Sequence, residues 1–186
     1  MNPGNPRIAV VLILGYPRGS EPHVVFTQRT QTVADHRGQI SLPGGSREPS
    51  DLDLAVTALR ETSEELGVCP EDVEVLGRLD DEYVVVSNFL IAPYVGALDR
   101  EPAFRPNPAE VAQVIEVPLE RLRDPSIYSE EDSFADARLR RMQFYRYNGH
   151  EIWGATARVL RKFLASEYPA LLAARYRDPR WEPRGG

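Results

Sequence analysis

Three glutamates close to a glycine pair are the residues of this sequence best suited to chemistry. Glu61, Glu64 and Glu65 hold relative positions 1, 4 and 5 of a predicted helix that follows Gly44-Gly45. Residues three and four apart share one face of a helix, so we expect these carboxylates to project toward one small volume. Like charges at that spacing cost an isolated helix roughly a few tenths of a kcal/mol per pair, which a bound cation would offset.

Carboxylate oxygens clustered in this way favour Mg²⁺ or Mn²⁺, hard cations that also share the phosphate oxygens of a substrate. A bound ion would offset phosphate charge and activate a water, so the pattern predicts hydrolysis of a diphosphate. The main chain approaches closely at a glycine, and the carbonyl of Gly44 is a candidate further ligand. An acidic helix face is more often only solvated, but the glycine pair, an acidic helix start and the terminal Gly67 together favour the metal site.

Two other charged residues are candidates for the same site. Arg60 directly precedes the cluster, and we expect it to orient one carboxylate through a bidentate contact. Glu110 lies in a proline-rich loop just before a predicted strand, where it is a candidate ligand or general base. The alternative for Glu110 is an ordinary solvated glutamate in a loop.

Composition limits the partners. The chain has 186 residues, enough for one domain with a sizeable core, and a net charge of −6. That charge disfavours non-specific attraction to nucleic acid or anionic membrane, so we expect neither as a partner. Cys69 is the only cysteine, which excludes an intrachain disulfide and fits a reducing compartment, so we expect a cytoplasmic location. No secretory signal is evident, and Ile8 to Leu14 is too short to span a membrane.

The elements that must position these residues are strands and helices in alternation. The glutamate-bearing helix is predicted to begin from a cap at Ser50 or Asp51 and to end at Gly67. Strands are predicted over residues 8–14, 23–29, 38–42, 73–79, 84–86, 89–95 and 111–117. A short helix over 118–122, a hairpin about Asn148-Gly149 and a helix over 153–166 follow. This order predicts an α/β sandwich around a mixed sheet.

The helix sequence Arg60 to Val68 resembles the second half of the Nudix box, with Thr62 where an aliphatic residue is usual. The first half departs from the pattern. Asp51 stands where the box has glutamate, and eight residues instead of seven separate it from Arg60.

An upstream stretch, Val25 to Thr30 followed by Gly38 to Gly45, resembles the signature of the coenzyme A pyrophosphatase branch of the Nudix hydrolases. Ala34 replaces an arginine of that signature, and Leu42 replaces a phenylalanine. Residues 104–111 and 152–158 also resemble that branch, so the likeness extends over most of the chain.

The resemblance implies a Nudix-type α/β/α sandwich around a mixed β-sheet, formed by a single domain over residues 1–186 with a polar, disordered tail from about 177. It implies Mg²⁺- or Mn²⁺-dependent attack of water on a diphosphate, giving 3′,5′-ADP and 4′-phosphopantetheine in the coenzyme A branch. Residues that it implies for the metal are Glu61, Glu64, Glu65 and the Gly44 carbonyl, with one glutamate as a candidate base. Residues that it implies for the substrate are Arg29, Gly45 and, in place of the missing arginine, His36 or Arg37.

Other interpretations stay open at this point. The substrate set could be broader, comprising ADP-ribose, NADH and nucleoside di- and triphosphates, or the chain could be a nucleotide-binding module without turnover. Arg29 could be a surface arginine at a strand end. Trp153 and Phe163 are expected as core or packing residues of the last helix, and Tyr83 and Phe89 as core residues, with base stacking the less favoured role for these two. Many members of the resembled family pair as homodimers, which leaves that state open here.

Overall fold

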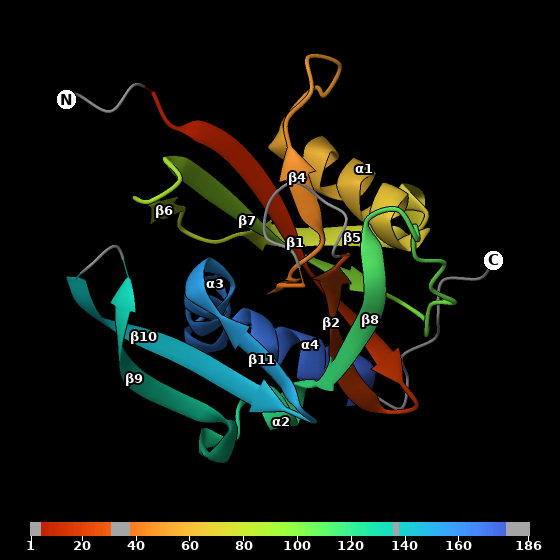
Figure 1. Cartoon of the computed structure of the whole chain (residues 1–186). Coiled ribbons are helices and arrows are strands. Elements are labelled where there is room, and N and C mark those ends of the chain that lie inside the picture. The colour runs from red at the N-terminus through yellow and green to blue at the C-terminus, as the bar shows by residue number, and fades with distance from the viewer. Residues whose placement is uncertain (1–4, 31–37, 136–137, 178–186) are drawn as a thin grey trace.

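The computed structural model describes residues 5–30, 38–135 and 138–177, and a mixed β-sheet runs through its middle (Figure 1). The strands are β1 (Arg7–Arg18), β2 (Glu21–Arg29), β3 (Ile40–Ser41), β4 (Gly44–Ser46), β5 (Val73–Arg78), β6 (Glu82–Val84), β7 (Phe89–Leu98), β8 (Val111–Pro118), β9 (Tyr128–Ala135), β10 (Arg138–Tyr147) and β11 (His150–Trp153). The helices are α1 (Leu54–Leu66), α2 (Leu119–Leu122), α3 (Gly154–Ala165) and α4 (Tyr168–Arg177), with 3₁₀ turns at Pro70–Asp72 and Pro125–Ile127.

The centre of the main sheet is the parallel pair β1 and β7, which stays in register from Arg7↔Phe89 to Gly15↔Ala97. The apolar run of β1 is buried on both faces, as a central parallel strand requires. β2 pairs with β1 only near their shared turn, and the two strands then separate. β3 and β4 fill the gap, since β3 pairs with β2 and β4 pairs with β1. This insertion brings the glycine pair of β4 under α1.

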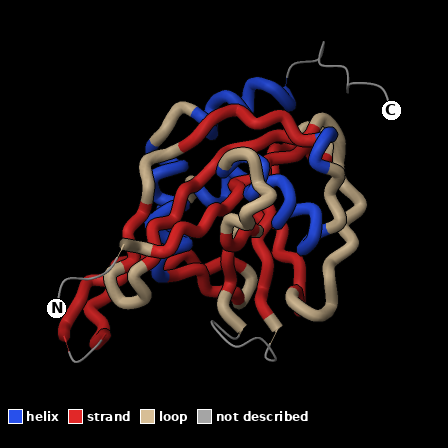
Figure 2. The backbone as a smooth tube through the Cα atoms, turned by 90° about the horizontal axis from the view of Figure 1, so that it is seen from above, coloured by secondary structure: helices blue, strands red, loops and turns tan. Residues whose placement is uncertain are grey.

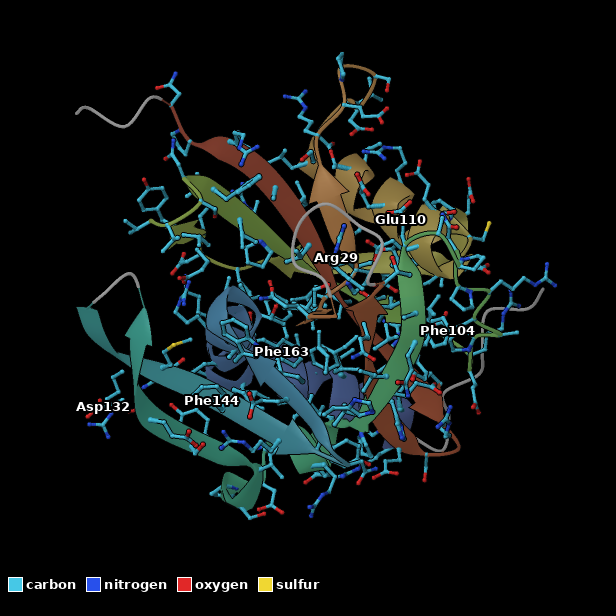
Figure 3. All side chains as sticks on the ribbon, viewed as in Figure 1. Arg29, Phe104, Glu110, Asp132, Phe144 and Phe163 are labelled. Atoms are coloured by element: carbon cyan, nitrogen blue, oxygen red, sulfur yellow. The ribbon has the colours of Figure 1, made fainter. Side chains whose placement is uncertain are left out.

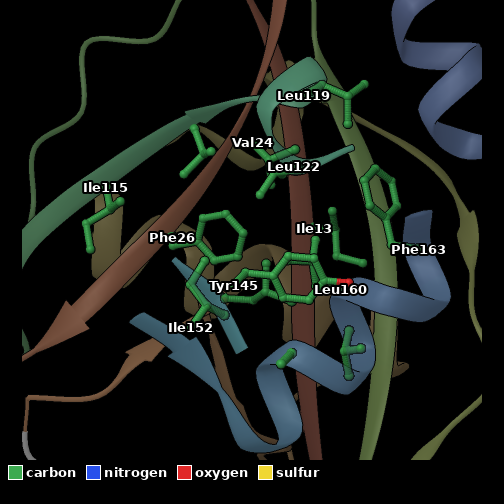
Figure 4. Close-up of a cluster of buried hydrophobic side chains, with 14 of the residues drawn as sticks. Ile13, Val24, Phe26, Ile115, Leu119, Leu122, Tyr145, Ile152, Leu160 and Phe163 are labelled. Atoms are coloured by element: carbon green, nitrogen blue, oxygen red, sulfur yellow. The ribbon is translucent and has the colours of Figure 1, made fainter. Parts of the chain in front are cut away.

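The two faces of the sheet are covered by different helices (Figures 1 and 2). Side chains alternate along β1, so Val10, Leu12 and Leu14 pack toward α1, while Ile13 joins Phe26 and the residues of α3 and α4. Figure 4 shows the second cluster, in which Phe26, Leu160 and Phe163 are fully buried. Each such side chain contributes about 1.5–3 kcal/mol relative to an exposed one. The three layers confirm the predicted α/β/α sandwich.

The boundaries of α1 agree with prediction at one end only. Gly67 closes the helix in the left-handed conformation, with φ +69°, and its N–H donates to the Ser63 carbonyl at 2.8 Å. The predicted cap at Ser50 or Asp51 is wrong, because Asp53 accepts the N–H of Val56 at 2.9 Å and caps the helix. Asp51 lies further back, where its carboxylate is free for another role.

The C-terminal part holds a second sheet, β9–β10–β11. The predicted hairpin at Asn148-Gly149 is confirmed, and both residues have positive φ. Strand β9 and helix α4 were not predicted. The strand predicted over 84–86 lies at Glu82–Val84 instead, with Val85 and Val86 exposed in a turn.

The tail predicted from about 177 falls almost entirely on residues outside the described ranges. Among the described residues, no helix is long and apolar enough to cross a membrane.

Candidate functional site

Glu65 is the most deeply buried of the three predicted helix carboxylates. Only 3% of the residue is exposed. Its Oε2 has no hydrogen-bond partner among the described residues. Burial raises the pKa of Glu65 to about 8, and the negative charges of Glu110 and Glu61 add to this shift, while Arg29 and the Gly44 main chain oppose it. A buried carboxylate with a bare oxygen favours a proton or a cation beside it.

Glu61 lies one helical turn earlier, against β4. A Cβ built on Gly45 would come within 2.4 Å of the Glu61 Cδ and 2.5 Å of both carboxylate oxygens. The carboxylate therefore occupies the space that any side chain at position 45 would need. Burial also raises the pKa of Glu61, with smaller contributions from Glu64 and Glu110, against the lowering effect of Arg60.

Arg60 makes the predicted bidentate contact, but with Asp51 and not with a helix glutamate. Its Nε and Nη2 donate to the two oxygens of Asp51, each at 3.1 Å. The same guanidinium donates to Glu61 and to Glu64, each at 3.0 Å. It therefore holds the acidic face of α1 together, while the Glu64 side chain stays 54% exposed.

Asp51 is the site residue whose role the sequence did not reveal. It is only 4% exposed, and besides Arg60 it accepts the Thr57 hydroxyl and the Glu48 N–H, each at 2.9 Å. It thus ties the loop after β4 to α1. Its place after Gly45 in the Nudix pattern was a signal for this role, although the spacing to Arg60 differs by one residue from the usual box.

Glu110 reaches the cluster because the loop before β8 is held against the end of α1. The N–H groups of Arg105 and Asn107 donate to the carbonyls of Leu66 and Glu65, at 2.8 and 2.9 Å. The Asn107 side chain then donates to Glu110 at 3.3 Å. Asn107, followed by proline, is a second residue that the sequence analysis missed, and an Asn-Pro pair is a known turn signal.

Arg29 ends β2 beside Glu110, as Figure 3 shows. The Thr30 N–H donates to the Glu110 carbonyl at 2.9 Å, which fixes the two segments together. The Nε of Arg29 is buried and has no partner among the described residues, and the guanidinium charge lowers the pKa of Glu65. A partly buried cation whose Nε has no partner among the described residues, next to acidic residues, is suited to an anionic substrate. This position favours the substrate role of Arg29 over that of an ordinary surface arginine.

The predicted convergence of three glutamates is seen only in part. Glu110 raises the pKa of both Glu61 and Glu65, and Glu61 adds to the rise at Glu65, whereas the Glu64 side chain lies toward Arg60 and solvent. In the ranges that the structure describes, no three or more His, Cys, Asp or Glu side chains are arranged to hold a metal ion. The ion pairs of Arg60 with Glu61 and Glu64 explain the arrangement. The donor set still fits a hard divalent cation, because it combines carboxylates with the bare Oε2 of Glu65.

Two predicted substrate residues, His36 and Arg37, lie outside the described residues, as does Ala34. Of the aromatic residues, Phe163 is fully buried as expected, whereas Trp153 ends β11 instead of lying in the last helix and is 38% exposed, so it is not a core residue. Tyr83 is 41% exposed, and Phe89 lies under Arg7.

Replacing Asp51 by Asn is expected to lower the thermal unfolding midpoint by roughly 10 °C at neutral pH, because Arg60 loses its buried counter-charge. Hydrogen bonding to Arg60 holds the pKa of Asp51 well below its usual value. The stability that this carboxylate contributes is therefore present above the unfolded pKa of 3.8 and is lost as the pH falls further. Thermal melts at neutral and acidic pH should show the deficit of Asp51→Asn narrowing on acidification.

The matched control is Glu48→Gln, since the Glu48 side chain is 60% exposed and lies 3.9 Å from Arg60. We expect this variant to stay within about 0.5 kcal/mol of the parent protein. Equal midpoints for Asp51→Asn and the parent protein at neutral pH would contradict the structural role of Asp51.

The chain is similar to a known family and to several of its members. The family model described as NUDIX domain matches residues 5–137. The Nudix hydrolase NudL of Photorhabdus laumondii is 37% identical over 75% of this chain and 74% of its own length. The mouse peroxisomal coenzyme A diphosphatase NUDT7 is 36% identical over 76% of this chain. The chloroplastic Nudix hydrolase 22 of Arabidopsis thaliana is 36% identical over 83% of this chain. The chain spans 59% and 53% of the lengths of these last two relatives.

Solved structures are similar in fold. The Nudix hydrolase RenU of M. smegmatis superposes with a TM-score of 0.58 at 19% identity and covers 86% of both chains. A NUDIX hydrolase from Alicyclobacillus acidocaldarius gives a TM-score of 0.54 at 17% identity, over 90% of this chain and 95% of its own. At these identities the likeness concerns the fold alone.

Proposed function

Because the chain belongs to the Nudix hydrolase family, we propose that it hydrolyses the diphosphate linkage of coenzyme A or its thioesters. The products would be 3′,5′-ADP and 4′-phosphopantetheine or its acyl form. The observation that carries the hydrolytic part is the buried Glu65 carboxylate, with its bare Oε2 near Arg29 and Glu110. The coenzyme A part is supported by the signature-like residues around Arg29 and 38–45, and by the relative named coenzyme A diphosphatase.

Nudix hydrolases typically use a divalent metal ion, and here Glu61, Glu64 and Glu65, with Glu110 or the Gly44 carbonyl, would hold Mg²⁺ or Mn²⁺. When bound, such an ion offsets the charge of the diphosphate and lowers the pKa of a water. The raised pKa values of Glu61 and Glu65 fit carboxylates that become ionised only with a cation beside them.

Residues of the chain itself would bind the substrate, accept the proton and hold the site in place. Arg29 would bind and orient the phosphate oxygens through its open Nε. Glu110, fixed by Asn107, is a candidate base that would take the proton of the attacking water. Arg60 and Asp51 would hold α1 and its loop in place without touching the substrate. Hydrolysis of a diphosphate depends mainly on such positioning and on electrostatics.

We expect purified protein with Mg²⁺ or Mn²⁺ to release 3′,5′-ADP from coenzyme A, and to lose this activity when the metal is chelated. In a substrate panel, kcat/KM for coenzyme A should exceed that for ADP-ribose, NADH and nucleoside di- and triphosphates by at least about tenfold. Chromatographic separation of the products measures each reaction.

The second candidate is a hydrolase of broader range, which Ala34 favours because the coenzyme A signature has an arginine there. If the protein cleaved ADP-ribose but left coenzyme A intact, the result would favour this candidate. Binding without turnover of any diphosphate would instead decide for a nucleotide-binding module. A cytoplasmic location and a homodimeric state are also proposals here, to be tested by fractionation and by the mass of the protein in solution.

A further inference from the structure

A cleft lies beside the end of β2, outside the group formed by Glu61, Glu65 and Glu110. Its volume is about 370 Å³. One wall comes from β2, β3 and the two residues before β3, and the other from the β10–β11 hairpin, which packs against β3. The lining residues used below are Gln28, Gln39, Ile40, Gly149, His150 and Trp153.

The wall of this cleft is bonded directly to Arg29. The Arg29 N–H donates to the Gln39 carbonyl at 3.0 Å, and the Gly38 N–H donates to the Arg29 carbonyl at 3.2 Å. Gln28 precedes Arg29 in β2 and pairs with Ile40 of β3. The cleft and the phosphate-binding arginine therefore belong to one hydrogen-bonded ladder, and a ligand held by one is placed relative to the other.

Neighbouring residues of a strand point to opposite faces, so Gln28 and Arg29 lie on different sides of the sheet. The packing agrees, because Val25 joins the cluster under α1 and Phe26 joins the cluster under α3. A ligand that reaches both sites must bend around the end of β2. A molecule in which a diphosphate joins two arms has the flexible link that such a path needs.

The chemistry of the cleft suits a flat heterocycle. Trp153 is 38% exposed, whereas the adjacent Ile152 is 1% exposed, so the indole is held by a fixed strand and still offers its surface. Apart from its two chain neighbours, no residue has a heavy atom within 4 Å of the Cβ position of Gly149, so the turn adds no bulk to this side of the cleft. Stacking of a base on an aromatic side chain contributes about 1–3 kcal/mol.

Two side-chain amides stand at the same cleft. The Gln28 Nε2 donates to the Gly38 carbonyl at 3.2 Å. This hydrogen bond orients the amide, and the amide oxygen points away from Gly38. A glutamine amide can pair with the amino group and ring nitrogen of adenine. Ile40 is the only aliphatic side chain among the lining residues, so a long acyl chain would find no continuous apolar wall. The lining favours a purine over the acyl or pantetheine arm.

We infer that this cleft binds the purine base of the substrate, stacked on Trp153 and paired with the amide of Gln28. The inference rests on the proposed function for the presence of a diphosphate at Arg29. It adds a site for the base on the opposite face of the sheet from the carboxylates.

A binding experiment without metal tests the cleft apart from hydrolysis. Trp181, outside the described residues, is the other tryptophan of the chain, so Trp181→Phe leaves Trp153 as the sole tryptophan. AMP should quench the emission of this protein in a saturable way, since the base covers the indole. Phosphopantetheine should leave the emission unchanged. No quenching at saturating AMP, or quenching by phosphopantetheine alone, would overturn the inference.

Kinetics with an adenine-containing substrate supply the second arm. Trp153→Leu should raise KM roughly tenfold or more with little change in kcat, and Trp153→Phe should restore most of the loss because it keeps an aromatic face. The control is Tyr83→Leu, which removes an aromatic residue of similar exposure, 41%, from β6. We expect the control to match the parent protein.

Together, the quenching and kinetic experiments test the base site independently of the proposed reaction. Equal KM values for Trp153→Leu and Tyr83→Leu, in an active enzyme, would overturn the base site and leave the hydrolase intact. Quenching by AMP in a protein that cleaves no diphosphate would support the base site and overturn the proposed reaction.

Discussion

Glu65→Gln is expected to lower kcat by about 100- to 1000-fold and to leave the protein folded. The substitution keeps the shape of the side chain but removes the charge from the most buried carboxylate of the cluster, whose Oε2 has no partner among the described residues. A neutral amide is a poor ligand for a hard cation, so affinity for Mn²⁺ should fall in parallel. Steady-state kinetics and titration with Mn²⁺ measure the two effects.

The same variant should be more stable than the parent protein at alkaline pH when metal is absent. Burial raises the pKa of Glu65 from 4.5 to about 8, so the folded state keeps a proton that the unfolded state has lost. The contribution of Glu65 to the free energy of unfolding is therefore greatest below pH 4.5 and decreases as the pH rises toward about 8. Glutamine cannot ionise, so the melting midpoint of Glu65→Gln should exceed that of the parent protein by roughly 5 °C near pH 8.

For the melting experiment, Glu64→Gln is the matched control, because it removes the same charge from the same helix at a side chain that is 54% exposed. Its stability should stay within about 0.5 kcal/mol of the parent protein. Unchanged turnover in Glu65→Gln would remove the argument for a metal site. A lower melting midpoint for Glu65→Gln at alkaline pH would show that burial of the ionised carboxylate does not destabilise the folded protein.

The second large effect concerns the glycine pair. Alanine substitutions at these two adjacent positions should impair different properties, catalysis at Gly45 and stability at Gly44. Gly45→Ala should lower kcat/KM about 100-fold while the melting midpoint changes little. The new Cβ meets only the end of the flexible Glu61 side chain, at 2.4 Å, so the carboxylate is displaced and the fold survives.

Gly44→Ala should instead lower the melting midpoint by roughly 10 °C or more. Here the Cβ would lie 2.1 Å from the Val10 carbonyl oxygen, and φ is +152°, which L side chains rarely adopt. The backbone of β4 must then move away from β1. Circular dichroism melts and Mn²⁺ titration distinguish the two variants. Equal losses of stability in both would contradict the separate roles of the two glycines.

Strong local signals explain what could be predicted from the sequence. The apolar run of β1, the glycine that ends α1 and the Asn148-Gly149 turn each have one favoured structure, and each was found as predicted. The acidic residues of the site were also identified, because Glu61 and Glu65 are spaced for one helix face.

The rest depends on contacts between distant segments. β9 is rich in charged residues, and its acidic side chains pair with arginines of β10, as in Glu131–Arg146 and Glu130–Arg141. No apolar alternation marks such a strand. α4 is apolar along most of its length, so no amphipathic pattern marks it, and it is held by Leu172 and by Tyr176, whose hydroxyl donates to the Gly15 and Leu98 carbonyls. Asp51 was undervalued for a similar reason, since its partners Thr57 and Arg60 come together only when the loop folds back onto the helix.

The main-chain bonds from Arg105 and Asn107 to the last carbonyls of α1 have a consequence for protein engineering. They set the separation of Glu65 and Glu110 through the backbone. Most side chains between Asp99 and Asn107 are therefore not needed to maintain it. Substitutions at the exposed Ala103 and Arg105 should therefore leave the acidic centre in place.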